Sequence, residues 1–424
     1  MSVRHTHPSA FMFLIVPFGV LSGYLTVAVA FLLAKNHVGV EAIAALVAAS
    51  LAPNVWKFAW APIADITLTS KKWYLISAVL TALGIFATGV LPMKASSLPM
   101  LTVITLVANV ACTFLGMATQ SLMAYGVPEA EKGRAGGWFQ AGNLGGGGIG
   151  GGIGLWLAQA LPAPWMSGAI LAGLCLLCAI PLLWVVEPAH ARPKGVVKAV
   201  VGVLADIWNL GRARMGFVAL FLCFLPIGSG AASGLWSAVA SDWKASANAV
   251  ALVTGVVGGL IMAVGSVAGG WICDRMDRKA AYALFGVLQA LSAVAMAIAP
   301  HTQHQYVIWT SVYAFVTGLT YAGFTAFVLE AMGHGAAATK FSLFASLSNF
   351  PIMYMTTFDG ASHTRWGASG MLYAEAAVGM GGLVLFVLFM AAVKAWWPKH
   401  WPQHVDETLV VPSLDIAAGA APLE

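Results

Sequence analysis

The stretch Gly270-Trp271-Ile272-Cys273-Asp274-Arg275-Met276-Asp277-Arg278-Lys279 is a charged segment between two long apolar runs. A shorter relative, Ala61-Pro62-Ile63-Ala64-Asp65, lies in the first half of the chain and is followed by Lys71 and Lys72. In both places an apolar run ends at an aspartate, polar residues with a basic pair follow, and a new apolar run begins. A repeat with a period of about half an apolar chain predicts two related bundles of membrane helices, an arrangement typical of transporters.

The composition indicates that the chain uses lipid as its solvent. Of its 424 residues, 60% are hydrophobic and only 9% are charged, whereas soluble domains carry about 25% charged residues. A membrane-spanning helix needs about 20 mostly apolar residues. Twelve such runs can be placed, at 10–34, 40–62, 73–93, 98–124, 136–160, 166–186, 215–239, 246–271, 280–299, 304–330, 339–358 and 369–394. The sequence therefore predicts an all-α polytopic membrane protein with twelve transmembrane helices in two pseudo-symmetric six-helix bundles.

Basic residues set the orientation, because Lys and Arg are retained in cytoplasmic loops. With the N-terminus inside, the outer loops hold only Lys35, Lys94, Lys244 and Arg365, and Lys57 lies within a span. The other sixteen of the 21 basic residues then fall on the inner side. We expect both termini in the cytoplasm. The net charge of +5 reflects this asymmetry and contact with anionic lipid, not binding to nucleic acid.

Four regions follow from this placement of the spans. We predict an N-terminal bundle at 1–187, a cytoplasmic central loop at 188–214, a C-terminal bundle at 215–398 and a polar cytoplasmic tail at 399–424. The central loop contains an amphipathic piece around 201–210.

Lys57 is a cation inside a predicted span. Such a charge costs a few kcal/mol unless it pairs or lines water. One interpretation is a contact with a substrate or counter-ion, and the other is that the long side chain reaches the cytoplasmic headgroups.

Polar residues recur at helical spacing in several spans and predict a cavity between helices. Hydrogen bonds between neighbouring helices are the alternative for the Ser and Thr residues. The candidate cavity residues are Lys57, Asn109, Thr113, Gln120, Tyr313, Thr317, Tyr321 and Asn349.

Carboxylates are the candidates for a proton relay, because all ten histidines fall in loops or termini of the predicted topology. Glu330 is at the inner end of its span, Asp359 at the outer end of the next, and Glu375 is the deepest of the three. A carboxylate in a low-dielectric environment favours its protonated form, which suits proton binding. The alternative is that Glu375 pairs with Arg365 or His363 at the outer interface.

The sequence contains no complete motif of an enzyme or of a dinucleotide-binding protein. Gly146, Gly148 and Gly151 match the pattern G-x-G-x-x-G. However, no predicted strand precedes them, and no acidic residue that could bind the ribose of a dinucleotide follows at the expected distance. We interpret the glycine run at 142–154 as a close interface between helices, or as local weakness of one helix. The sequence lacks H-E-x-x-H and G-x-S-x-G. We therefore expect neither an enzyme nor a cofactor or metal site.

The residues of the repeat resemble a known signature. Gly270-x-x-x-Asp274-Arg275-x-x-Arg278-Lys279 resembles the loop between helices 8 and 9 of the major facilitator superfamily, and Asp65 with Lys71 and Lys72 resembles its partner between helices 2 and 3. This chain has Asp277 and Ala61 where the family prefers glycine. The resemblance implies a cytoplasmic gate, for which the candidates are Asp65, Lys71, Lys72, Arg134, Gly270, Asp274, Arg275, Arg278 and Lys279.

Within the superfamily, residues 56–65 are similar to the branch with anhydromuropeptide permeases, acetyl-coenzyme A transporters and siderophore permeases. The resemblance implies an alternating-access permease in a bacterial inner membrane, a monomer that imports a small-molecule solute by symport with protons. We hypothesise a medium-sized polar or anionic organic solute. The alternatives are an exporter of drugs or metabolites and a non-transporting membrane sensor with the same fold.

Overall fold

A computed structural model describes residues 6–38, 40–187, 196–333 and 336–396, and these residues form helices and connecting segments without strands. Those before residue 188 are α1 (Ala10–Gly23), η1 (Tyr24–Val29), α2 (Ala30–Lys35), α3 (Val40–Trp56), η2 (Lys57–Ala59), α4 (Ala61–Ile66), α5 (Ser70–Val90), η3 (Ala95–Ser97), α6 (Leu98–Gly126), η4 (Glu129–Glu131), α7 (Lys132–Gly148), η5 (Ile149–Ile153), α8 (Gly154–Ala160), α9 (Pro164–Leu177) and η6 (Ile180–Leu183). Those after residue 195 are α10 (Val196–Arg212), α11 (Arg214–Leu222), η7 (Ala231–Leu235), α12 (Trp236–Val239), η8 (Ala240–Trp243), α13 (Ala247–Thr254), α14 (Val256–Cys273), α15 (Arg278–Ile298), α16 (Gln303–Ala331), α17 (Ala337–Leu347) and α18 (Asn349–Trp396).

Eight helical segments among the described residues are long and apolar enough to cross a membrane. The last, Ala337–Trp396, has 60 residues, about twice what the hydrocarbon core of a bilayer can hold even with tilt. Gly367 divides it, with φ 69° and ψ −173°. It therefore contains two crossings, and the first helix runs past the predicted end at residue 358.

The other three predicted spans are present as interrupted helices. The span at 40–62 consists of α3, η2 and α4; the span at 136–160 changes to a π-helix at η5; and the span at 215–239 breaks between α11 and η7. Gly228 and Gly230, both with positive φ, lie in that last break. An interruption divides a span into shorter helical pieces, but the chain still crosses the membrane there. The twelve predicted crossings are thus all accounted for.

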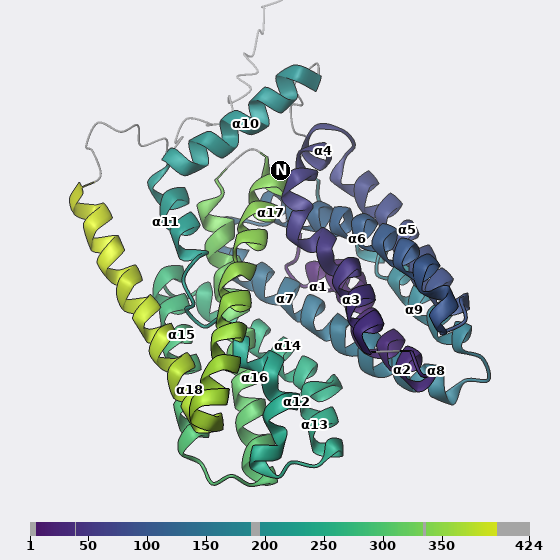
Figure 1. Cartoon of the computed structure of the whole chain (residues 1–424). Helices are drawn as coiled ribbons and strands as arrows, with labels where there is room; N and C mark the ends of the chain where they lie inside the picture. Colours follow the sequence, from purple (N-terminus) through teal and green to yellow (C-terminus); the bar gives the residue numbers. More distant parts are fainter. Residues whose placement is uncertain (1–5, 39, 188–195, 334–335, 397–424) are drawn as a thin grey trace, which may run out of the picture.

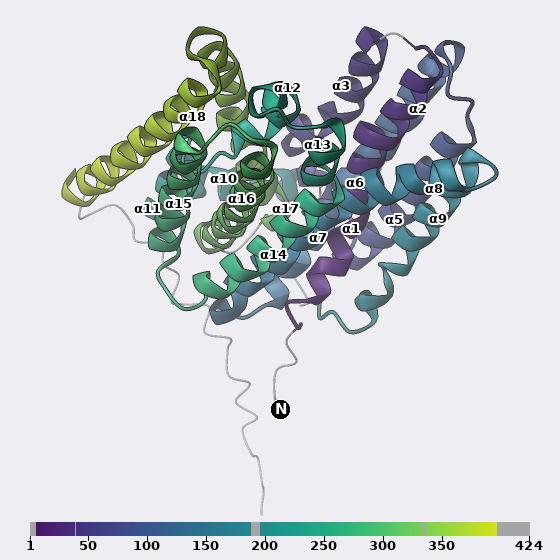
Figure 2. The ribbon, with the colours of Figure 1, turned by 90° about the horizontal axis from the view of Figure 1, so that it is seen from below.

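The helices form two groups that meet along a central seam. Figure 1 shows α1–α9 on the right and α11–α18 on the left and at the lower centre, with α10 at the top. Along the seam, α7 of the first group packs on α14 and α16 of the second, and the view from below places α14 beside α7 and α1 (Figure 2). We propose that these groups are the two predicted bundles. The predicted tail at 399–424 and residues 188–195 of the central loop lie outside the described residues.

We call the end of the molecule that carries the charged connections α4–α5, η4–α7 and α14–α15 the basic end. Helices α4 and α10, which contact each other at this end, lie at the top of Figure 1. Side-chain caps start the helices that follow both copies of the repeat. Thr69 accepts a hydrogen bond from the backbone N–H of Lys72, and Asp277 accepts one from the N–H of Ala280 at 3.0 Å. Such caps satisfy N–H groups that a helix N-terminus leaves free. Asp277 thus starts α15 with a cap where the family signature has glycine.

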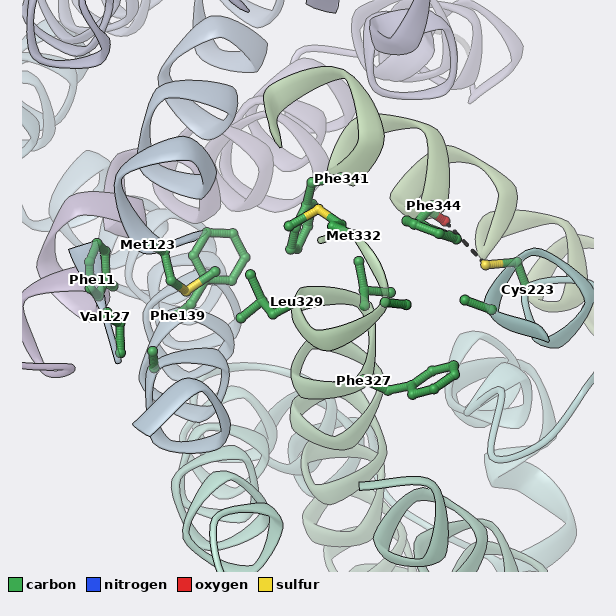
Figure 3. Close-up of a cluster of buried hydrophobic side chains, with 14 of the residues drawn as sticks. Phe11, Met123, Val127, Phe139, Cys223, Phe327, Leu329, Met332, Phe341 and Phe344 are labelled. Atoms are coloured by element: carbon green, nitrogen blue, oxygen red, sulfur yellow. Dashed lines mark hydrogen bonds between the residues drawn. The ribbon is translucent and has the colours of Figure 1, made fainter. Parts of the chain in front are cut away.

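Apolar side chains from both groups close the seam near the basic end (Figure 3). Phe11, Met123 and Phe139 come from the first group and Leu329 and Phe341 from the second, and all five are buried. The rings of Phe139 and Phe341 have centroids 6.0 Å apart in an edge-to-face arrangement. This cluster excludes water from the seam between the basic end and the middle of the molecule.

Candidate functional site

Asp274 joins α14 to the first turn of α7 across the seam. Its Oδ2 accepts hydrogen bonds from the backbone N–H of Arg134 at 3.1 Å and from Arg134 Nε at 2.8 Å. The carboxylate side chain is only 6% exposed. A buried carboxylate at a helix N-terminus is stabilised by the partial positive charge of the helix and by charge-assisted hydrogen bonds. Asp274 therefore links the two bundles.

Asp65 makes the corresponding contact in the other direction. It ends α4 of the first bundle and accepts hydrogen bonds from the N–H groups of Ala338 at 3.1 Å and Thr339 at 2.9 Å, in the first turn of α17. Burial raises the pKa of Asp65, and the hydrogen bonds from Thr339 and Ala338 lower it by less, so the pKa lies above its usual value. Each copy of the repeat thus places its aspartate on a helix N-terminus of the opposite bundle.

Arg278 forms a third contact across the seam. Its Nη1 lies 2.5 Å from Glu129 Oε1 of η4 and 3.2 Å from Glu330 Oε2 of α16, and its side chain is 9% exposed. Glu129 also pairs with Lys132 at 2.7 Å. Burial raises the pKa of Glu129, but hydrogen bonds from Lys132 and Arg278 lower it further, so the pKa lies below its usual value. Glu330 therefore belongs to this basic-end cluster, away from the other predicted relay carboxylates.

The remaining basic residues of the signature do not cross the seam within the described part of the chain. Arg275 stacks on Trp271, with its guanidinium 3.5 Å from the ring centroid. Lys71, Lys72 and Lys279 make no ion pair among the described residues. We limit the proposed gate contacts to Asp65, Asp274, Arg134 and Arg278 with their partners.

Gly270 permits the close approach of α14 to α7. A Cβ atom at this position would lie 2.5 Å from the carbonyl oxygen of Gly133 and 2.8 Å from the Cα of Gly137. Backbone atoms cannot move aside as a flexible side chain can. The glycine of the signature is thus needed where the two bundles touch.

A cavity of about 200 Å³ lies in the seam and is lined in part by Phe139 and Phe341 of the apolar cluster. Four predicted cavity residues line it, namely Lys57, Gln120, Tyr321 and Asn349. Its walls come from α1, α3, η2, α6 and α7 on one side and from α16, α17 and the start of α18 on the other. The cavity therefore lies between the two bundles, as predicted for a transport site.

Lys57 is buried at the edge of this cavity, in η2. Only 8% of the residue is exposed, and its Nζ lies 6.0 Å from the centre of the Phe18 ring. It makes no ion pair with a carboxylate among the described residues. The side chain points into the protein and does not reach for headgroups.

Five polar residues that line the cavity were not among the predicted ones, namely Asn54, Gln140, Asn143, Thr325 and Ser348. Gln140 of α7 donates to Thr325 Oγ1 of α16 at 2.8 Å, and Asn143 donates to Gln140 Oε1 at 3.2 Å. Two amides three residues apart in a span can indicate such a hydrogen-bond network, but Asn143 lies within the glycine run, whose two interpretations, a close helix interface or a locally weak helix, do not include a cavity.

The other predicted cavity residues take part in packing contacts. Thr113 accepts a hydrogen bond from Trp60 Nε1 at 3.0 Å, Asn109 donates to the Thr105 carbonyl, and Thr317 accepts one from Gln289 Nε2 at 3.3 Å. Tyr313 donates to Glu375. These four residues do not line the central cavity.

Glu375 and Asp359 are two buried carboxylates of α18 that interact electrostatically, and we call them the acidic pair. Glu375 Oε1 accepts hydrogen bonds from Tyr313 and from the N–H of Ala232, the latter at 3.4 Å. Its Oε2 and both oxygens of Asp359 have no hydrogen-bond partner among the described residues. His363, an alternative partner of Glu375, instead contacts Asp242 at 2.6 Å. The salt bridges among the described residues include none between Glu375 and His363 or Arg365.

Small pockets with shared lining residues lie between Glu375 and the central cavity. Tyr321 and Asn349 line the cavity and also a neighbouring pocket, which in turn shares Gly228 and Ser229 with a third pocket. Glu375 lines that third pocket, whose volume of about 10 Å³ suits one water molecule. Two pockets that share lining residues thus lie between Glu375 and the central cavity.

Comparison with known proteins agrees with this geometry. The sequence profile of the Major Facilitator Superfamily matches residues 10–356. The Anhydromuropeptide permease of Escherichia coli is 24% identical over 349 residues, which cover 79% of this chain and 70% of the permease. The Escherichia coli fucose:proton symporter FucP superimposes with a TM-score of 0.64 at 15% identity, covering 90% of this chain and 98% of FucP. The human organic anion transporter MFSD10 superimposes with a TM-score of 0.64 at 14% identity, covering 89% of this chain and 98% of MFSD10.

The chain belongs to the Major Facilitator Superfamily. It is a multi-pass secondary transporter of small-molecule solutes and not an enzyme. More particularly, it is a distant relative of the anhydromuropeptide permease. The two solved structures show the fold alone.

Proposed function

We propose that this protein imports a medium-sized polar or anionic organic solute across the inner membrane of a bacterium, driven by protons. It works by alternating access, as a monomer, with the basic end and both termini in the cytoplasm. The observation that carries the choice of substrate is Lys57, a buried cation beside the cavity between the bundles.

An anionic group on the solute would pair with the buried charge of Lys57. A buried charge without a partner costs several kcal/mol, and the described residues offer no carboxylate to it. Gln120 and Asn349 add polar groups on facing walls, and Tyr321 adds an aromatic ring. This combination suits a solute with a carboxylate or phosphate and a polar body.

The basic-end contacts would form the gate. Asp65, Asp274 and Arg278 each join one bundle to the other in the present arrangement. A cytoplasmic exit would require all three contacts to break and the apolar cluster to separate. The free-energy difference between the arrangements, more than the strength of each contact, would set which one is populated.

Protons would bind at Glu375 and Asp359. Two buried carboxylates close to each other cannot both be ionised at low cost, so one proton is readily shared between them. The small pockets between Glu375 and the cavity would let solute binding on one side influence proton binding on the other.

Uptake into proteoliposomes tests the substrate class. We would supply three labelled solutes in turn, an anhydromuropeptide, a ferric siderophore and acetyl-coenzyme A, and we expect uptake of one. The relative named above makes the anhydromuropeptide the first choice. Binding of a solute without uptake would indicate a sensor. Uptake that occurs only into inverted vesicles, with a proton gradient directed outward, would indicate an exporter.

Replacing Lys57 with Ala should weaken binding of the anionic solute by about 10-fold or more, because a hydrogen bond to a charged group contributes about 1.5–3 kcal/mol. Equilibrium binding to purified protein measures this. Lys35→Ala, at the far end of α2 from the basic end, is the control and should bind normally. Equal affinities of Lys57→Ala and the unmodified protein would remove Lys57 from the binding site.

Replacing Asp274 with Asn should slow transport about 10-fold while the solute still binds, because the change affects a contact of the gate and not the cavity. Initial uptake rates and equilibrium binding, measured side by side, give the two quantities. Asp242→Asn, in η8, is a matched loss of one carboxylate outside the gate. Parallel losses of binding and transport in Asp274→Asn would contradict a gate role.

A further inference from the structure

An apolar groove of about 1050 Å³ runs along the outside of the seam. Its floor is formed by small residues of α7 and α14, among them Gly142, Gly145 and Ala263. Its walls are larger side chains, including Phe13 of α1 and Val264 of α14, which is 62% exposed. Every lining residue is uncharged. At Gly145 this face of α7 is open, because a Cβ there would meet only Ala263 Cβ, at 3.8 Å.

The groove has a charged residue at the end nearest the basic end. Trp271 lines the groove there and carries Arg275 on its ring, and Arg275 Nη1 also donates to the Trp271 carbonyl at 3.1 Å. The neighbouring carboxylates are already engaged, Asp274 by Arg134 and Asp277 by the N–H of Ala280. The exposed guanidinium of Arg275 therefore has no carboxylate partner among the described residues.

We propose that this groove binds one anionic phospholipid of the cytoplasmic leaflet, with an acyl chain between α1, α7 and α14 and the phosphate on Arg275. The apolar groove matches the chain, and the cation at its end matches the headgroup. The Arg275–Trp271 stack holds the guanidinium at the interface, where tryptophan is favoured. The site is independent of the substrate and of proton coupling.

The lipid would contact both bundles at once, because α1 and α7 belong to the first bundle and α14 to the second. It would thus favour the arrangement in which the basic end is closed.

Lipid binding to the purified full-length chain tests this proposal. Native mass spectrometry would compare retention of phosphatidylglycerol with that of phosphatidylcholine. We expect phosphatidylglycerol to bind roughly five-fold more tightly, and Arg275→Gln to abolish the preference. The matched control is Arg212→Gln, because Arg212 also stacks on a tryptophan, Trp208 of α10, with a separation of 4.6 Å, away from the groove. It should keep the preference.

A second substitution tests the groove itself. Gly145 has room for a side chain, since its nearest neighbour would be Ala263 Cβ at 3.8 Å. Gly145→Leu should therefore lower retention of both lipids, and Val264→Gln on the wall should do so if Gly145→Leu does not fold. The proposal is overturned if the unmodified chain shows no preference, if Arg275→Gln and Arg212→Gln behave alike, or if the groove substitutions change nothing.

Discussion

Glu375→Gln should abolish accumulation of solute against its gradient while exchange of solute across the membrane continues. Glutamine has the shape of a protonated glutamate, and it keeps an oxygen that can accept the hydrogen bonds from Tyr313 and Ala232. What it loses is the ability to release and bind a proton. A transporter without that step can equilibrate its solute but cannot couple the movement to a proton gradient.

The measurement compares gradient-driven uptake with counterflow in the same proteoliposomes. Asp242→Asn is the control, because Asp242 contacts His363 and takes no part in the acidic pair. It should retain both activities. Accumulation by Glu375→Gln at the level of the unmodified protein would exclude Glu375 from coupling, and loss of counterflow as well would point to a structural role.

Gly270→Ala should shift the protein away from the arrangement closed at the basic end. The new Cβ would meet two backbone atoms of α7, at 2.5 Å and 2.8 Å. Overpacking of this kind costs about 1–3 kcal/mol, which corresponds to a change of about 5- to 150-fold in the balance between two states. This cost applies only to the arrangement in which α7 and α14 touch. The population of the arrangement that is open at the basic end should therefore increase.

Labelling of a cysteine introduced at Ser348, on the wall of the central cavity, would report this shift. The five native cysteines are all buried. A membrane-impermeant reagent applied from the basic end should react faster in the Gly270→Ala background. Gly173→Ala is the matched control, because a Cβ there meets nothing within 4 Å. Unchanged labelling in Gly270→Ala would show that this close approach does not hold the gate.

The repeat could be predicted from sequence because its chemistry is local. An aspartate at the end of one apolar run can cap a neighbouring helix, and the structure places both Asp65 and Asp274 on such N-termini. Which helix each would cap depends on the packing of two bundles, and local sequence does not contain that information. The same limit explains Glu330, whose position in its span did not reveal that Arg278 lies beside it.

The interior of the spans was harder to predict. Helical spacing shows that polar residues share a face, but that face can meet a cavity or another helix. Tyr321 and Gln120 reach the cavity, whereas Thr113 and Asn109 satisfy hydrogen bonds with nearby groups. The π-helix in the glycine run could not be predicted either. A change from α-helical to π-helical backbone hydrogen bonds leaves the sequence as apolar as the rest of the span, so hydrophobic periodicity does not reveal it.

The central proposal, symport of protons with the solute, is tested most directly with a pH electrode. The solute that proves to be transported is added to lightly buffered proteoliposomes without an imposed gradient. The external medium should become more alkaline as protons enter with the solute, and Glu375→Gln should show no such change. Solute uptake by the unmodified protein without a change in external pH would contradict proton coupling.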